Sequence, residues 1–299
     1  AHGRRILKVM IGGRLALAVA LALSGALAFA VATVAQQRAA ARSSDLEARG
    51  RGFVVQLLRR PQWWAGTMGN GAGYVLQALA LGFGSLLVVQ PIMVTSLLFA
   101  LPLGARLAHR RLTGSVWMWG LVLAASLALF VSLGHPNRGA SHASRHGWLI
   151  ATAIGIPVIV ACLVTAHPRS GPTRASLLAI AVGVLAGALA VLTKAVVATV
   201  PLGFVHLATA AETYGLVLVG LGGVYVQQLA FQAGALQASL PIMAVLEPMV
   251  AAILGLTLLH EQLQATGLRL AVLGVAAVAM TLATVALARG EAHLAPDVA

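Results

Sequence analysis

The fold of this chain is decided by one apolar stretch, Leu236–Leu259 (LQASLPIMAVLEPMVAAILGLTLL). A run of that length is typical of a membrane-spanning helix, because about 20 apolar residues cross a bilayer. It holds one carboxylate, Glu247. A carboxylate at membrane depth costs about 2.5–3.5 kcal/mol on insertion scales and is found mainly where function requires it. Pro248 weakens the helical hydrogen-bond ladder at the same place. Together the two residues predict a polar site in the middle of a helix bundle.

The composition indicates an all-α integral membrane protein. Of 299 residues, 60% are hydrophobic and only 9% are charged, whereas a soluble domain carries roughly 25% charged residues. The basic residues behind the formal net charge of +13 lie almost entirely between hydrophobic runs. They therefore report membrane topology, and we expect no nucleic-acid partner. The single cysteine, Cys162, excludes an intrachain disulfide and a cysteine metal cluster. We expect no cofactor, no metal-ligand set and no enzymatic constellation.

Apolar runs of spanning length predict nine transmembrane helices. They cover Leu15–Ala35, Trp63–Phe83, Ser85–Leu107, Ser115–Leu133, Trp148–Ala166, Ala175–Val200, Leu207–Phe231, Leu236–Leu259 and Leu268–Leu287. The predicted organisation has a first four-helix repeat, a linking helix with its loops, a second and inverted four-helix repeat, and a C-terminal tail. These parts cover residues 1–134, 135–173, 174–289 and 290–299.

Basic loops predict the orientation of the chain in a cell membrane. The loop at residues 38–61 is rich in arginine, and placing it in the cytoplasm puts most other basic loops and the C-terminus there too. Its middle, residues 53–58, is compatible with a short amphipathic helix on the membrane surface or with a plain basic loop. The cluster from Arg4 to Arg14 opposes this orientation, because it falls outside. Three of its four basic residues would be absent if Met10 were the start.

The two halves of the chain resemble each other. Gln90-Pro91-Ile92-Met93 in the third predicted span matches Leu240-Pro241-Ile242-Met243 in the eighth. Four spans followed by one extra span force the second set of four to enter the membrane from the opposite side. The pattern predicts an inverted repeat, an arrangement common in secondary transporters. Chance similarity between helices rich in Ala, Leu and Val is the alternative.

These motifs resemble the drug/metabolite transporter superfamily, in its EamA-like or NIPA-like branch of actinobacterial type. The likeness rests on Glu247-Pro248 followed by Leu259–Leu263 (LHEQL), and in the first half on Arg60–Gly66 (RPQWWAG) and Val89-Gln90-Pro91. The first repeat departs from the pattern, because Leu97-Leu98 stands where the second has Glu-Pro. Better-known members of the superfamily have ten spans, against the nine predicted here.

The candidate residues of a transport pathway are polar, charged or helix-breaking residues within apolar runs. They are Glu247, Pro248, Glu212, Lys194, Gln90, Pro91, Pro241, Tyr214 and Gln228. Glu247 would ligate a cation, carry a coupling proton or cap the backbone freed by Pro248. Glu212 lies in the pathway or at the solvated interface. Lys194 either extends to the outer surface or pairs with Glu212.

The remaining candidates have structural alternatives as well. Interhelical hydrogen bonds are the usual reason for glutamines in apolar runs, with substrate contact as the other reading. Pro91 and Pro241 predict interruptions at matching points of the two repeats, a pointer to a binding site in transporters.

The resemblance implies a secondary transporter that moves a small organic metabolite or drug-like solute by alternating access. The alternative is a NIPA-like transporter of magnesium or another divalent cation. Mg²⁺ prefers oxygen ligands, often carboxylates, and Glu212 and Glu247 are the two candidates at depth. The expected partners are the solute, a coupling ion such as H⁺ or Mg²⁺, and the lipid bilayer. A homodimer is compatible with the sequence.

Overall fold

The structure is a computed structural model that describes residues 2–41, 61–107, 112–134, 137, 139–140, 142–233 and 236–294. Within these residues the regular elements are helices. They are α1 (His2–Ala41), α3 (Pro61–Phe83), α4 (Leu86–Met93), α5 (Ser96–Leu107), α6 (Gly114–Gly134), α7 (Arg145–Ala166), α8 (Gly171–Thr199), the 3₁₀ turn η2 (Val200–Leu202), α9 (Phe204–Thr209), α10 (Ala211–Gln232), α11 (Leu236–Leu258) and α12 (Leu268–Leu294). Apolar runs fold this way because a bilayer requires each backbone N–H and C=O to be satisfied within its own segment.

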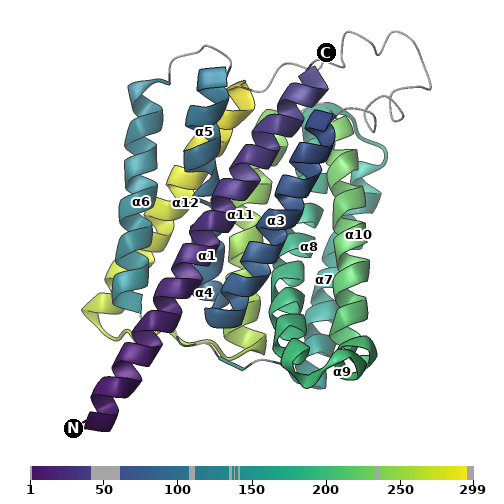
Figure 1. Cartoon of the computed structure of the whole chain (residues 1–299). Coiled ribbons are helices and arrows are strands. Elements are labelled where there is room, and N and C mark those ends of the chain that lie inside the picture. Colours follow the sequence, from purple (N-terminus) through teal and green to yellow (C-terminus); the bar gives the residue numbers. More distant parts are fainter. Residues whose placement is uncertain are drawn as a thin grey trace.

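The long helices lie roughly side by side in one bundle, with the N-terminus at one end and the C-terminus at the other (Figure 1). Eight helical segments of the described chain are long and apolar enough to cross a membrane. They lie in α1, α4–α5, α6, α7, α8–η2, α10, α11 and α12. The chain is therefore a multi-pass, membrane-embedded protein. α3 is not among these segments, since Asn70 and Gln77 dilute its apolar residues. It packs along α1 instead.

The predicted spans are confirmed as helical, but several details are wrong. The seventh, Leu207–Phe231, begins in α9 and passes a break at Ala210, whose backbone is extended, before α10 starts. The third span is divided into α4 and α5 after Pro91. At the division Thr95 N donates to Ile92 O at 2.9 Å, and Leu98 N donates to Thr95 O at 2.9 Å, the three-residue spacing of a tighter helix. α11 continues unbroken through Pro241 and Pro248, so the interruption exists in the first half alone. α12 also runs on to Leu294, into the predicted tail.

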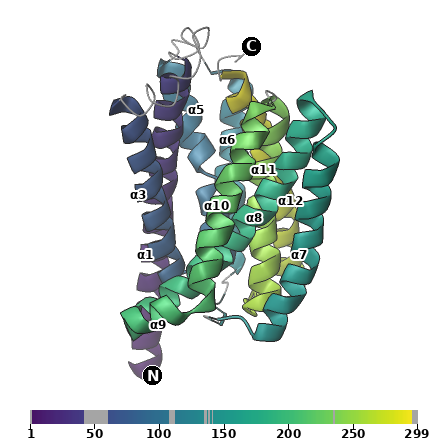
Figure 2. The same cartoon turned by 90° about the vertical axis from the view of Figure 1, so that its right-hand side faces the viewer.

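The helices pack in two groups of similar pattern. α1 contacts α3, α4 and α5, and α8 contacts α10 and α11. α1 starts at the end of the bundle marked N, whereas α8 runs toward that end and is followed there by α9 (Figures 1 and 2). The groups meet where α11 contacts α4 and where α12 contacts α5 and α6. Two groups of opposed direction are what an inverted repeat requires, and the repeat itself stays a prediction. The predicted surface helix at residues 53–58 lies outside the described residues.

Two connections at one end of the bundle pair with each other. The connection from α6 to α7 donates Ala140 N to Leu259 O at 2.6 Å and Asn137 N to Gln262 O at 3.0 Å. Gln262 N donates in return to Asn137 Oδ1 at 2.8 Å. Gly139, at a φ of +59°, allows this approach, because a Cβ there would lie 2.3 Å from Leu259 O. The connection between α11 and α12 is thus held against the end of α6.

Candidate functional site

The polar centre of the bundle is set by the close packing of α8 against α11. Gly183 and Gly187 lie four residues apart on α8, the small-residue spacing that lets membrane helices approach closely. A Cβ on Gly183 would lie 2.4 Å from Leu246 Cβ, and one on Gly187 would lie 2.6 Å from Val250 Cβ. Both partners flank Glu247 in α11. The glycines therefore fix the depth and rotation at which the Glu247 carboxylate enters the bundle.

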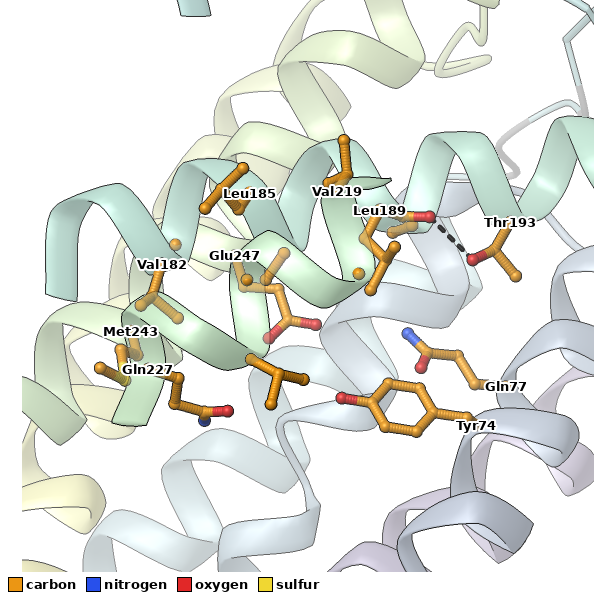
Figure 3. Close-up of a pocket in the computed structure, with 16 residues that line it drawn as sticks. Tyr74, Gln77, Val182, Leu185, Leu189, Thr193, Val219, Gln227, Met243 and Glu247 are labelled. Carbon is orange, nitrogen blue, oxygen red and sulfur yellow. Dashed lines mark hydrogen bonds between the residues drawn. The ribbon is translucent and has the colours of Figure 1, made fainter. Parts of the chain in front are cut away.

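Glu247 is half-buried and lines two neighbouring cavities, of about 110 Å³ and about 210 Å³. Measured in the same way, a single water needs about 10–15 Å³, so both spaces can hold a solute of several heavy atoms. Tyr74 and Gln77 of α3 line both cavities as well. In Figure 3 the carboxylate of Glu247, the hydroxyl of Tyr74 and the amide of Gln77 point toward the same space. No described residue forms a hydrogen bond or ion pair with the Glu247 carboxylate.

The first cavity is formed mainly by the second half of the chain. Small residues of α8 and α10 make room for it, among them Ala186, Gly220 and Gly223. Gln227 of α10 adds a second amide to the lining. Thr193 contributes little polarity, because its hydroxyl already donates to Leu189 O at 2.7 Å (Figure 3). Apart from Glu247, Gln227 and the two α3 residues, this cavity is therefore lined mainly by apolar and small side chains.

The second cavity lies against the first half of the chain. Phe29 of α1 lines it and packs edge-on against Tyr74, with ring centroids 4.9 Å apart and an interplanar angle of 84°. Gln90 of α4 also lines it, with only 1% of its surface exposed. The Gln90 Nε2 has no hydrogen-bond partner within the described chain. An unsatisfied buried donor costs about 1–3 kcal/mol, and an acceptor bound next to Gln90 would remove that cost.

Another carboxylate, that of Glu261, is buried at one end of the bundle. Glu261, 2% exposed, follows α11 and lies 2.5 Å from the Nζ of Lys194 on α8. It also accepts hydrogen bonds from Leu86 N at 2.8 Å and Leu87 N at 3.1 Å, the first amides of α4. An anion at a helix N-terminus is favourable because the free amides and the helix dipole both attract it. Glu261 therefore joins α8, α4 and the α11–α12 connection.

This ion pair corrects the prediction for Lys194. The side chain does not extend to the surface and does not pair with Glu212, because it is only 5% exposed and its partner is Glu261. The sequence contains the signal in the LHEQL motif, but the motif follows the end of a helix. Hydropathy alone could not show that the connection after α11 folds back into the bundle.

The comparisons with known proteins give one informative match. The chain is 38% identical over 274 residues to an uncharacterized protein of Corynebacterium glutamicum, a match that covers 91% of this chain and 95% of the relative. The chain belongs to that protein's family. No family model matches the chain, and no solved structure matches it. The match therefore extends over most of both chains rather than over one shared segment.

The structure brings some of the predicted pathway residues together and leaves others apart. Glu247, Pro248 and Gln90 line the second cavity. Pro91 and Pro241 are buried in α4 and α11 and line neither cavity.

The predicted residues of α10 lie away from the centre. Glu212, at the start of α10, lies 3.9 Å from the Nδ1 of His142 and lines neither cavity. Tyr214 is 61% exposed, and its hydroxyl donates to Ala208 O at 2.7 Å. Gln228 is exposed, whereas its neighbour Gln227 lines the first cavity. One residue turns a helix by about 100°, which is enough to exchange the inner face for the outer one.

Proposed function

We propose that this protein is a secondary transporter of the drug/metabolite transporter superfamily, which moves a small organic solute by alternating access between two inverted repeats. The observation that carries the proposal is the Glu247 carboxylate. It lies midway along α11, has no partner among the described residues and faces two cavities lined by both halves of the chain. Binding sites at the interface between repeats are common in such transporters.

The same proposal includes nine membrane crossings, with α3 as the one that hydropathy does not identify. α3 packs along α1 and supplies Tyr74 and Gln77 to the cavities. Its counterpart in the second half is α10, which packs on α8 and supplies Gln227. The polar residues that weaken the apolar signal of α3 are therefore the ones a transport pathway needs. Basic loops orient the chain with its C-terminus in the cytoplasm.

The Glu261–Lys194 pair supplies a closed gate at one end of the pathway. It connects the second half, through α8 and the α11–α12 connection, to the first half at the N-terminus of α4. Opening this end requires the two hydrogen bonds to α4 to break, while the ion pair travels with the second half. By the proposed orientation this is the external end, and the proposal therefore assigns the structure to a state closed toward the outside.

Magnesium transport has less support. Mg²⁺ binds through carboxylates in octahedral geometry and keeps much of its water. Among the described residues no group of three or more His, Cys, Asp or Glu side chains could hold a metal ion. Glu247 is the one carboxylate that lines the two cavities, and an organic solute needs fewer charged ligands than a dehydrated divalent ion.

The test is transport by purified protein in liposomes. A panel of organic solutes and Mg²⁺ is first screened for thermal stabilisation, since a ligand that binds only the folded state raises the melting temperature. Uptake of the best solute is then measured. We expect Glu247→Gln to insert and to be at least as stable as wild type, because it removes an unpaired carboxylate. It should lose uptake by at least about 100-fold, since the charge of a carboxylate is worth several kcal/mol to a bound cationic group in a site of low dielectric.

The matched control is Glu212→Gln. It removes a carboxylate that lies on α10 outside both cavities, and we expect it to keep normal uptake. Normal uptake by Glu247→Gln would overturn the proposal. Stabilisation and uptake of Mg²⁺ alone would replace it by the divalent-cation alternative.

A further inference from the structure

The charged side chains that line the two cavities indicate which class of solute could bind there. Glu247 is their one acidic lining residue, and the described residues that line them include no Lys, Arg or His. Lys194 follows the cavity residue Thr193 in sequence, yet its ammonium lies against Glu261 instead. The cavities therefore present one carboxyl group with no protein cation in their walls. A charge at this depth is costly unless it is paired.

The groups around Glu247 favour an organic cation over a metal ion. Phe29 and Tyr74 place two aromatic rings in the lining of the second cavity. Aromatic rings attract organic ammonium groups. The remaining lining residues of this cavity are largely apolar, among them Met93, Leu97 and Ala244. Such walls suit methyl and methylene groups and offer few of the oxygen ligands that Mg²⁺ requires.

Gln90 adds a second requirement. Its Nε2 is a buried donor without a partner in the described chain, and a donor of this kind needs an acceptor oxygen. Gln90 lies on α4 and Glu247 on α11, and both line the same cavity of about 210 Å³. A solute that satisfies both would carry a positive charge at one end and a hydroxyl, ether or carbonyl oxygen at the other.

We propose that the transported solute is a small organic cation, an amine or quaternary ammonium compound, with an acceptor oxygen a few bonds from the charge. Its ammonium group is held by Glu247 beside Phe29 and Tyr74, and its oxygen accepts from Gln90. This inference rests on the proposed function, because it assumes that the two cavities form the solute site. It goes further by fixing the charge of the solute and its hydrogen-bonding end.

The experiment compares pairs of probes that differ only in charge. Choline is paired with its uncharged carbon isostere, in which a tert-butyl group replaces the trimethylammonium group, and ethanolamine is paired with propanol. Dissociation constants are measured by calorimetry on the full-length protein in lipid nanodiscs. We expect the charged member of at least one pair to bind at least about 10-fold more tightly, the effect of roughly 1.4 kcal/mol of charge recognition. Glu247→Gln should abolish this preference, and Glu212→Gln should keep it.

A third probe tests the role of Gln90. Propyltrimethylammonium has a methyl group where choline has its hydroxyl. Wild-type protein should bind choline more tightly than this analogue, and Gln90→Leu should bind both equally. Equal binding by wild-type protein would overturn the acceptor part of the proposal.

The remaining outcomes distinguish failure of the organic-cation inference from failure of the proposed transport function. Equal binding of charged and neutral probes, tighter binding of the neutral probes, or no binding of either cation would overturn the inference. If liposomes still take up another organic solute in a Glu247-dependent manner, the proposed transport function stands and only the organic-cation inference fails. Binding and uptake of Mg²⁺ alone would overturn both.

Discussion

The replacement of Lys194 by methionine tests the buried ion pair directly. Methionine keeps most of the length and apolar volume of the lysine stem but removes its charge. Glu261 would then remain 2% exposed without its cation, which lies at 2.5 Å in the wild-type protein. Removal of one partner of a buried pair costs about 3–5 kcal/mol, because the other charge is left uncompensated.

The expected loss lies near the lower end of that range. Glu261 keeps two hydrogen bonds, from Leu86 N and Leu87 N, and hydrogen bonds to a charged group contribute about 1.5–3 kcal/mol each. We therefore expect Lys194→Met to lower the free energy of unfolding by about 3 kcal/mol, a large part of the 5–15 kcal/mol typical of a folded protein.

The double variant Lys194→Met/Glu261→Gln should recover most of this loss. It removes the stranded charge and keeps one carbonyl oxygen as an acceptor for the first amide of α4. Its free energy of unfolding should lie within about 1–2 kcal/mol of wild type, since it lacks one of the hydrogen bonds that Glu261 accepts.

The assay is reversible denaturation of the wild-type protein, both single variants and the double variant in the same detergent. The four free energies give the coupling between the two residues. Glu212→Gln serves as the control for loss of a carboxylate. Glu212 lies at the start of α10, 3.9 Å from His142, and both side chains are partly exposed. This variant should change the free energy of unfolding by less than about 1 kcal/mol. Additive losses, with the double variant the least stable, would refute the reasoning.

Two further predictions concern packing and topology. Gly187→Ala should lower the free energy of unfolding by about 1–3 kcal/mol through overpacking, because its Cβ would meet Val250 Cβ at 2.6 Å. The control is Gly155→Ala, where no atom lies within 4 Å of the added Cβ, and it should leave the melting temperature unchanged or raise it. Five proposed crossings, α6, α7, α8, α10 and α11, separate Arg106 from Gln262. Single cysteines at these two positions in a cysteine-free background should therefore react with impermeant reagents from opposite faces. Labelling from the same face would contradict the topology of this part of the chain.

The helices could be predicted from the sequence because each membrane-spanning helix needs an apolar run of about 20 residues. Leu236–Leu258 and Gly114–Gly134 match their predicted spans to within one residue. Glu247 could be singled out for the same reason, since a carboxylate in such a run needs an explanation. These inferences use local information, which a hydropathy pattern contains.

The rest of the site depends on contacts between distant segments. Glu261 and Lys194 are 67 residues apart, and the turn that brings them together has no apolar signal. The sequence also could not show which face of α10 points into the bundle. Apolar residues lie on all sides of this helix, and Gln227 and Gln228 are adjacent residues of the same type, so nothing local distinguishes the inner one from the outer one. The break between α4 and α5 depends on the turn at Thr95, while proline alone leaves α11 continuous.

The pairing between the α6–α7 and α11–α12 connections has a consequence for hydrogen exchange. Ala140 N, Asn137 N and Gln262 N are all held by bonds that cross from one connection to the other. Their amide protons can exchange with water only when the two connections separate, so they should exchange together as one cooperative unit. If the gate opens by moving both connections as a body, these amides stay protected while Leu86 N and Leu87 N, which Glu261 holds, become labelled.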